Sequence, residues 1–284
     1  MKRRDFLKTS AAGIAGIGLS PMLLQSCTSQ DPLHDFGIIS GVIKNELEVD
    51  PKGTLRQIAE MGYKYLEFGG TFGMKAMELK SFLNEIGLIP LAGGTSMASF
   101  QGDGLQKAID DQLAMDKKYL VCYWPWMDSG ENLTMDQLNF AVEQFHRIGE
   151  ACNKSGIRFA FHNHDKEFQR VGDVHVYEYF LEKTDPKLVT MQLDLYWAIV
   201  GGADPVEFIE KYPGRYELIH VKDSYDKSER HSFACVGEGV IDFERILRLR
   251  DAGNFKHLIV EKDGATEGIK CARTSIEHLK TLDF

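Results

Sequence analysis

The chain has 284 residues, of which 43% are hydrophobic and 26% are charged, and its formal net charge is −9. This length and composition suit one large globular domain. An acidic surface repels phosphate backbones and anionic lipid, so nucleic acid is not expected as a partner.

A basic and then apolar leader comes first in the chain. Lys2, Arg3 and Arg4 precede an uncharged run from Thr9 to Ser26 that is rich in Ala, Gly, Ile and Leu. This order is typical of a signal peptide with a twin-arginine start. Three glycines and a proline interrupt the run, which falls short of the ~20 residues that a transmembrane helix needs.

The leader ends at Leu24-Gln25-Ser26-Cys27, which resembles a bacterial lipobox, where the cysteine is lipidated and becomes the mature N-terminus. We therefore expect residues 1–26 to be a signal peptide, Cys27 to be acylated and residues 27–35 to be a linker. Stable anchoring needs more than one acyl chain, which such a modified cysteine carries. The expected location is periplasmic or outer-membrane-associated, with membrane contact only through the lipid anchor.

From residue 36 onward, short apolar runs alternate with amphipathic stretches of about ten to twenty residues, the pattern of repeated βα units. Strands are predicted over residues 36–42, 63–68, 88–92, 119–123, 157–162, 188–193, 216–221 and 257–261. Helices are predicted over residues 54–61, 75–86, 105–115, 134–155, 174–183, 205–212, 243–252 and 267–282.

Eight such units in one unbroken stretch predict an α/β fold, a (β/α)₈ TIM barrel over residues 36–284. An open doubly wound sheet is disfavoured, because no Gly-x-Gly-x-x-Gly turn follows the first strand. The cysteines at 122, 152, 235 and 271 show no CxxC pairing. We therefore expect isolated buried thiols and neither a zinc ribbon nor a disulfide framework.

Polar side chains lie at the C-terminal ends of the predicted strands, where barrel enzymes carry their active sites. A lone histidine there would more often be a satisfied structural group than a ligand. Four neighbouring strand ends together instead predict one divalent ion, Mn²⁺, Zn²⁺, Co²⁺ or Fe²⁺. The expected ligands are His162, Asp194, His220 and Glu261.

Six segments spread over the domain carry a family resemblance: 50–55 (DPKGTL), 61–67 (MGYKYLE), 161–168 (FHNHDKEF), 193–197 (LDLYW), 219–223 (IHVKD) and 260–263 (VEKD). With these segments the sequence resembles the sugar phosphate isomerase/epimerase family, the xylose isomerase-like barrels. The resemblance implies one divalent ion on residues of strands five to eight, which in the epimerases are Glu, Asp, His and Glu. Asp194, His220 and Glu261 match the last three.

Strand five departs from the epimerase pattern, because His162 stands where their first glutamate falls. Epimerases of the family use two metal-bound glutamates on opposite sides of the sugar, and only Glu261 is present here. Trp197 also replaces a histidine that often binds their substrate. The segments around His162 and His220 look more like the branch with inosose dehydratase and the lyases acting on 3-keto-glycosides.

The family chemistry implies that the metal binds a ketone oxygen and the neighbouring hydroxyl, and stabilises an enediolate while a base removes the α-proton. Reprotonation gives an isomer or epimer, whereas loss of a β-oxygen substituent gives elimination, which we expect to dominate. His164, Lys222 and Glu261 are the candidate bases and acids, and a Lys222 that is partly buried next to the metal would have a lowered pKa. Alternatively, Lys222 pairs with Asp223 or Glu67 and only shapes the pocket.

Aromatic side chains at strand ends indicate a carbohydrate ligand, because their faces stack on the apolar side of sugar rings. Trp124, Trp126 and Trp197 are the expected sugar-binding residues, with Trp124 packing in the core as the alternative. We expect Glu67 either to accept a hydrogen bond from a substrate hydroxyl or to serve as a structural partner. Without a Gly-rich phosphate cradle or an arginine cluster, an unphosphorylated sugar fits better.

Two other classes of function need weighing. A non-catalytic sugar-binding lipoprotein would bind its ligand equally well in the presence of a chelator. The related barrel endonucleases carry a three-metal cluster with more histidines and a basic surface, which this acidic chain lacks. Homo-oligomers are common among relatives, so a second copy is a possible partner.

Overall fold

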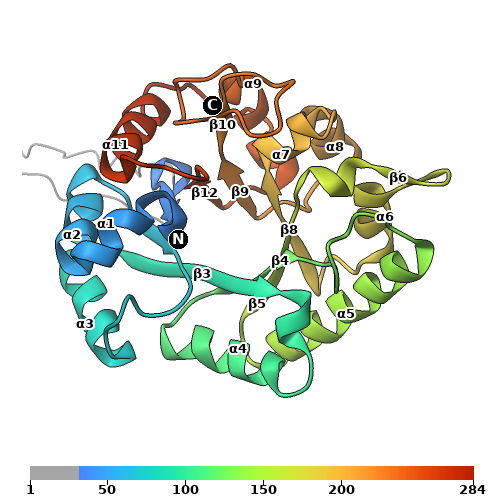
Figure 1. Cartoon of the computed structure of the whole chain (residues 1–284), viewed down its shortest axis with the longest axis horizontal. Helices are drawn as coiled ribbons and strands as arrows, with labels where there is room; N and C mark the ends of the chain where they lie inside the picture. Colours follow the sequence, from blue (N-terminus) through green and yellow to red (C-terminus); the bar gives the residue numbers. More distant parts are fainter. Residues whose placement is uncertain (1–31) are drawn as a thin grey trace, which may run out of the picture. The chain divides into compact units, whose positions relative to one another are not determined.

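The computed structural model describes residues 32–284, so the predicted leader and Cys27 lie outside the described residues. Eight parallel strands close into a barrel in the order β1-β12-β9-β8-β5-β4-β3-β2 (Figure 1). The predicted TIM barrel is therefore confirmed. The barrel strands are β1 (Gly37–Ile39), β2 (Tyr65–Glu67), β3 (Ile89–Ser96), β4 (Tyr119–Trp124), β5 (Arg158–His162), β8 (Val189–Asp194), β9 (Leu218–Val221) and β12 (His257–Val260).

Helices cover the outside of the barrel, and two short hairpins extend the loops after β5 and β9. The hairpins are β6 (Arg170–Val171) with β7 (Val174–His175), and β10 (Asp223–Ser224) with β11 (Phe233–Ala234). The helices are α1 (Lys44–Val49), α2 (Pro51–Met61), α3 (Ala76–Ile86), α4 (Gly104–Ala114), α5 (Met135–Lys154), α6 (Val176–Lys183), α7 (Leu195–Val200), α8 (Pro205–Lys211), α9 (Phe243–Leu247), α10 (Arg250–Gly253) and α11 (Gly268–Leu279).

Local sequence signals set the helix ends. The α2 helix begins after Asp50, whose side chain accepts from the Gly53 amide, and it ends at Gly62 with φ 102°. Only glycine adopts such a left-handed conformation without strain. The α5 helix begins with a capping box between Thr134 and Gln137, which satisfies amides that the first turn leaves unpaired.

The barrel interior changes from apolar to polar along the strands. Leu91, Tyr119, Val121, Ala160, Leu218 and Ile259 form a separate buried cluster. Side chains two residues apart point to the same face of a strand. His162 therefore lies two residues above Ala160, and His220 lies above Leu218. The apolar layer fills the barrel interior toward the N-terminal ends of the strands, so the polar side chains gather at the C-terminal ends of the strands.

The first predicted strand is shorter than expected, because the chain turns into a 3₁₀ helix over Ser40–Ile43 and then α1. The short α7 helix after Asp194 was also not predicted. Within the predicted linker, Leu33 is buried in the core and His34 stacks on Phe284. The packing of the barrel thus begins before residue 36.

One expectation about the cysteines is wrong. Cys235 and Cys271 form a disulfide, with Cα atoms 5.4 Å apart, whereas Cys122 and Cys152 are free and buried. A separation of 36 residues carries no recognisable motif, and only the packing of the segment after β11 near α11 brings the two sulfurs together.

Among the residues that the structure describes, no helix has the length and apolar character needed to cross a membrane.

Candidate metal centre

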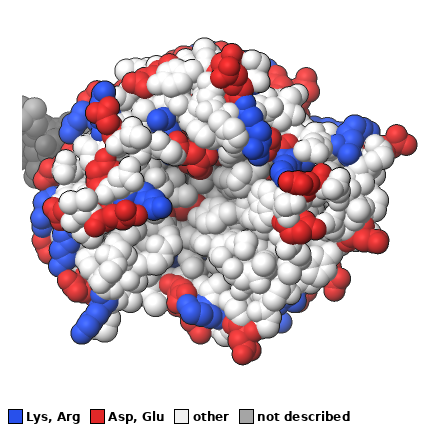
Figure 2. All heavy atoms as spheres, viewed as in Figure 1, with Lys and Arg blue, Asp and Glu red and all other residues white. Residues whose placement is uncertain are grey.

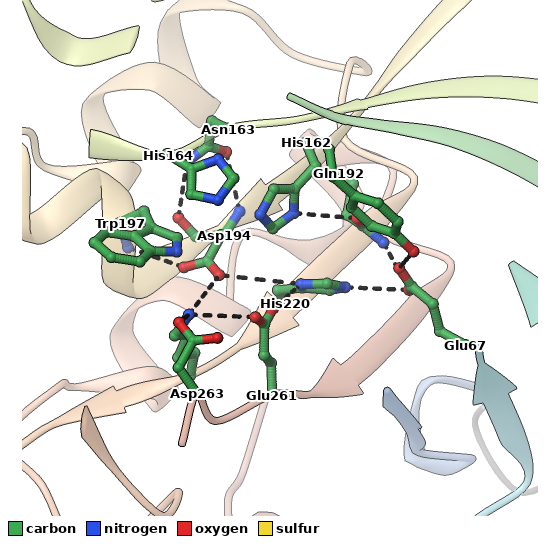
Figure 3. A network of polar contacts seen from close by, with 12 residues as sticks. Glu67, His162, Asn163, His164, Gln192, Asp194, Trp197, His220, Glu261 and Asp263 are labelled. Atoms are coloured by element: carbon green, nitrogen blue, oxygen red, sulfur yellow. Dashed lines mark hydrogen bonds and ion pairs between the residues drawn. The ribbon is translucent and has the colours of Figure 1, made fainter. Parts of the chain in front are cut away.

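Four side chains from consecutive barrel strands converge at the C-terminal end of the barrel. They are His162 at the end of β5, Asp194 at the end of β8, His220 in β9 and Glu261 directly after β12. Each offers one ligand atom, and these atoms all lie within 4.8 Å of one another. Figure 3 shows the four side chains pointing toward a common centre. The four residues that the strand-end pattern predicted as ligands are therefore brought together.

Hydrogen bonds fix which nitrogen of each histidine faces this centre. His220 Nε2 lies 3.1 Å from Glu67 Oε2, so Nε2 donates to Glu67 and Nδ1 is the ring nitrogen that faces the centre. Gln192 Nε2 donates to Glu67 Oε2 over 2.8 Å, which orients Gln192 Oε1 toward His162 Nδ1 at 3.1 Å. His162 therefore presents Nε2. Glu67 orients one histidine directly and the other through Gln192.

In each of the two carboxylates, Asp194 and Glu261, one oxygen accepts a hydrogen bond from the protein and the other faces the centre. Asp194 Oδ1 accepts from the Trp197 amide over 2.9 Å and so caps α7. Glu261 Oε1 accepts from Lys222 Nζ over 3.2 Å. Asp194 Oδ2, Glu261 Oε2 and His220 Nδ1 are buried without a conventional hydrogen bond in the described part of the chain, and His220 Nδ1 lies against Glu261 Oε2 and 4.0 Å from Asp194 Oδ2. Buried polar atoms that face one another without hydrogen bonds are costly unless a cation binds between them, so this donor set fits a divalent cation.

The buried charges of the cluster shift its pKa values strongly. Burial raises the pKa of Asp194. Burial acts in the same direction on Glu261, but Lys222 and His220 outweigh it and hold the pKa of Glu261 well below its ordinary value. Burial opposes charge on His220, yet the carboxylates of Glu67 and Glu261 raise its pKa to about 10. The carboxylates therefore favour positive charge at this centre.

Lys222 is fully buried in contact with both aromatic rings and carboxylates. Its Nζ lies 4.6 Å from the Trp197 ring centroid and donates to Asp263 over 2.6 Å and to Glu261. The side chains alone do not produce the lowered pKa that was expected beside a metal. Desolvation acts in that direction, but the carboxylates of Glu261, Asp194 and Asp263 together raise the pKa above its ordinary value. Lys222 is therefore a charged donor, and neither Asp223 nor Glu67 is its ion-pair partner.

His164 lies beside the centre with a free ring nitrogen. Its ring centroid is 4.9 Å from that of His162 and 5.4 Å from that of Trp197. Nδ1 is buried without a hydrogen-bond partner in the described part of the chain. Burial lowers the pKa of His164 to about 4, so the ring is neutral near pH 7. A neutral imidazole in this position can accept a proton.

Glu167 holds the loop that carries His164. Its carboxylate is fully buried and accepts from the His164 amide over 2.6 Å and from Trp126 Nε1 over 2.7 Å. Burial raises the pKa of Glu167 to about 7, although both hydrogen bonds lower it. Glu167 thus connects the loop after β5 with the loop after β4.

Glu67 is placed as a structural partner and not as a substrate-binding residue. It is fully buried, and its carboxylate accepts from Tyr123 Oη over 2.6 Å as well as from Gln192 and His220. Three donors occupy the carboxylate, and the histidine rings lie between it and the convergence point in Figure 3. These contacts favour the structural role for Glu67 over the substrate-binding one.

The three predicted sugar-binding tryptophans differ in exposure. Trp126 is 2% exposed and donates a hydrogen bond to Glu167, so its ring packs in the core, and its contact with substrate stays a prediction. Trp197 is 5% exposed, between Lys222 and the guanidinium of Arg230, whose centre lies 5.3 Å from the ring centroid. Trp124 is half-buried and makes an edge contact with His164 at 5.5 Å. The core packing suggested for Trp124 belongs instead to Trp126.

The loop after β9 is built around the Asp223 carboxylate. It accepts from the backbone amides of Ser224, Gly237, Gly239 and Ile241. A Cβ at Gly239 would lie 2.3 Å from Asp223 Oδ1, so a side chain cannot be accommodated there. Asp223 therefore shapes the rim of the site. Charged side chains of both signs surround a central hollow in Figure 2.

Sequence reasoning missed four residues that complete this site: Tyr123, Glu167, Gln192 and Asp263. Gln192 and Tyr123 lie in barrel strands, and Gln192 is two residues before Asp194 and shares its face. The two-residue period of a strand could have identified it. Asp263 stands two residues after Glu261 in a segment that was quoted without assigning it a role. Glu167 carries no comparable signal, because its burial depends on the fold of a loop.

Comparisons with known proteins agree with this architecture. The family model of the xylose isomerase-like TIM barrel matches residues 55–282. The chain is similar to an inosose dehydratase of Geobacillus kaustophilus (strain HTA426), with 27% identity over 66% of this chain and 72% of that protein. An inosose dehydratase of Clostridium perfringens (strain 13 / Type A) is 24% identical over 66% of this chain and 62% of its own length. The second alignment thus spans less than two thirds of that relative.

Solved structures show the same fold. A sugar phosphate isomerase/epimerase from Parabacteroides distasonis ATCC 8503 superposes with a TM-score of 0.74 and 26% identity, covering 86% of this chain and 93% of that chain. A D-allulose 3-epimerase from a Methylomonas species, in complex with D-allulose, gives a TM-score of 0.70 at 14% identity. That match covers 88% of this chain and 97% of the epimerase, and at this identity it shows the fold alone.

Proposed function

Because the chain belongs to the xylose isomerase-like TIM barrel family and is an enzyme of that family, we propose that it is a divalent-metal-dependent lyase acting on a keto-sugar or 3-keto-glycoside. The proposed reaction removes the proton next to the ketone and then eliminates the substituent on the β-carbon. The observation that carries the proposal is the set of His162, Asp194, His220 and Glu261, in which each side chain turns one ligand atom toward a shared centre and these atoms lie within 4.8 Å of one another.

Nitrogen and oxygen donors of this kind suit Mn²⁺, Zn²⁺, Co²⁺ or Fe²⁺. When bound, such an ion supplies a Lewis acid that makes the proton next to a ketone easier to remove. Glu67 supports metal binding although it is not one of the four candidate ligands. It holds the rings of His220 and His162 in the orientation that metal binding requires. Partners of this kind strengthen metal binding and are part of the site.

His164 is the proposed base. Its neutral ring and unpaired Nδ1 allow it to take the α-proton, and the C–H electron pair then forms the enediolate. As the C–O bond to the β-substituent breaks, the leaving oxygen receives a proton from Lys222. Of the two roles expected for Lys222, base or acid, a charged and buried lysine suits the acid role better. The products are an unsaturated ketone and an alcohol, or water where the substituent is a hydroxyl.

Elimination is preferred over epimerisation because the site is one-sided. Epimerisation needs a group on each face of the sugar that can exchange a proton with the same carbon. Among the described residues, Glu261 is the one glutamate in the candidate ligand set, and it pairs with Lys222. The relatives named as inosose dehydratases are consistent with a reaction that removes a group from a keto-ring.

We further propose that the protein is exported as a lipoprotein anchored through Cys27. The order of twin arginine, apolar run and cysteine in residues 1–27 motivates this proposal. The Cys235–Cys271 disulfide supports it, since disulfides persist mainly in oxidising compartments. Mass spectrometry of protein from the native host should find a diacylated or triacylated Cys27 at the N-terminus. An intact Met1 or an unmodified Cys27 would refute the proposal.

The proposed reaction can be tested with purified protein and a panel of keto-inositols, keto-sugars and 3-keto-glycosides. Substrate loss should require a divalent ion, stop with a chelator and return when Mn²⁺ or Co²⁺ is added in excess. Product analysis should find release of an alcohol or water and an unsaturated ketone. Binding of a sugar that no chelator affects, with no turnover of any member of the panel, would favour a non-catalytic sugar-binding protein.

A further inference from the structure

A cavity lies outside the barrel wall and is lined by α4, by Ala76 at the start of α3 and by residues at the ends of β2 and β3. Figure 1 shows how these helices and strands are arranged. The volume of the cavity is about 480 Å³, which is enough for a small ligand. The walls come from residues 68–71 after β2, from Gly94 and Thr95 in β3, and from one face of α4. None of the four candidate metal ligands lines it, so it is separate from the site described above.

Lys117 brings a buried positive charge to this cavity. The residue is 5% exposed, and its Nζ donates to the Phe68 carbonyl and lies 3.5 Å from the Phe68 ring centroid. Within residues 32–284 no carboxylate forms an ion pair with it, although burial lowers its pKa to about 8 and Glu67 and Asp111 act against that shift from farther away. A buried cation without a counter-ion is costly, and an anion in the cavity would compensate it.

Space for the ammonium group is provided by a glycine. A Cβ at Gly93 would lie 2.7 Å from Lys117 Nζ and 2.3 Å from the Phe68 oxygen, so any larger residue would displace the lysine. The same position is 3.1 Å from Gln112 Oε1. Gln112 is 6% exposed, and its Oε1 is buried without a hydrogen-bond partner in the part of the chain that the structure describes. A free acceptor therefore lies near the unpaired cation.

The other charges of the cavity wall are already matched. Lys107 donates to Asp111 over 2.7 Å on the exposed side of α4. Lys117 is therefore the cation that remains for a ligand, and Gln112 Oε1 is the acceptor that remains. The two groups together would recognise a molecule that carries both a negative oxygen and a hydroxyl hydrogen.

From this arrangement we propose that the cavity is a binding site for a small hydroxylated oxyanion, either hydrogen phosphate or a short hydroxy acid. The anionic oxygen binds Lys117, the hydroxyl donates to Gln112, and Thr95 at the wall offers a further hydroxyl. Phe68, whose carbonyl holds Lys117, directly follows Glu67, so the site lies one residue from the group that orients the metal ligands.

The test is calorimetric titration of the metal-free mature protein with inorganic phosphate and, separately, with glycerate. At least one of them should bind saturably with a Kd of about 1 mM or lower. The variant Lys117→Met should weaken binding about tenfold or more, since it removes a charge-assisted hydrogen bond. The matched control is Lys118→Met, which removes the same charge from the exposed neighbouring residue and should leave the affinity unchanged.

Two further variants keep the result interpretable. Ala108→Phe fills the cavity from α4 without changing a charged residue, and it should abolish binding. It therefore tests the proposal in case Lys117→Met does not fold. Asp194→Asn disables the candidate metal centre and should leave binding intact. The proposal is overturned if neither anion binds saturably, if Ala108→Phe or a folded Lys117→Met binds as tightly as the wild type, or if only Asp194→Asn loses binding. Because turnover is not measured, failure here leaves the proposed reaction unaffected.

Discussion

The role assigned to Glu67 leads to a quantitative prediction for Glu67→Gln. The glutamate accepts from Tyr123, Gln192 and His220 within the barrel. A glutamine has one acceptor oxygen and adds two N–H donors, so it cannot satisfy all three donors. Where the new amide group faces His220 Nε2, the proton on that ring must move to Nδ1. His220 then has no lone pair for the metal.

The expected effect is a loss of metal affinity with the fold retained. Losing a single partner of a metal ligand costs about 10- to 100-fold in affinity, or roughly 1.4 to 2.7 kcal/mol. Glu67 orients two of the four candidate ligands, His220 directly and His162 through Gln192. We therefore expect the upper end of that range. The Kd for Mn²⁺ can be measured by competition with a chelating fluorescent indicator.

Glu217→Gln is the matched control for this experiment. Glu217 is also buried, accepts from Tyr119 Oη over 2.9 Å and lies just before β9 at the other end of the barrel. Its replacement should lower thermal stability and leave the metal Kd unchanged. A folded Glu67→Gln protein with wild-type affinity for Mn²⁺ would show that Glu67 does not position the ligands. A raised KM with unchanged metal affinity would restore the earlier hypothesis that Glu67 binds the substrate.

Three further predictions follow from the site. Asp194→Ala and His220→Ala should each abolish stoichiometric metal by elemental analysis, and metal retained in both would refute the ligand set. Lys222→Met and His164→Gln should each lower kcat about 10²-fold or more with normal metal content, and wild-type turnover in both would refute their roles as acid and base. Burial raises the folded-state pKa of Glu167 from its ordinary value of 4.5 to about 7, so between these pH values the native state binds more protons than the unfolded state. Its contribution to stability is therefore lost as pH rises through that window. The unfolding free energy of wild type relative to Glu167→Gln should fall by about 3 kcal/mol across it. A difference that does not vary with pH would contradict the burial of this carboxyl.

The strand ends could be predicted because their pattern is local. His162, Asp194, His220 and Glu261 each follow a short apolar run, and parallel strands in a closed barrel must place such positions at one rim. The prediction of the fold depended on the same alternation of strands and helices. The predictions of the fold and of the ligand set remain correct even where the predicted ends of strands and helices are wrong by a few residues. The short β1 and the additional α7 are examples of such errors.

The remaining features depend on packing between distant segments. The upward shift of the Lys222 pKa could not be predicted, because it depends on the carboxylates of Asp263 and Asp194. No sequence pattern gives the distances of these carboxylates from Nζ. Trp126 looked equivalent to Trp124 in sequence, and only the buried Glu167 carboxylate distinguishes them. The disulfide joins residues of two different βα units, so it too required the folded chain.

The central claim, proton removal next to a ketone followed by elimination, is tested most directly by the fate of hydrogen in D₂O. The protein is incubated with Mn²⁺ and 3-keto-glycosides, and both the sugar and the released group are followed by mass spectrometry. The account predicts metal-dependent release of the β-substituent with loss of the α-hydrogen, and no release with His164→Gln. Deuterium entering the sugar while every substituent stays in place would contradict elimination and indicate an isomerase or epimerase.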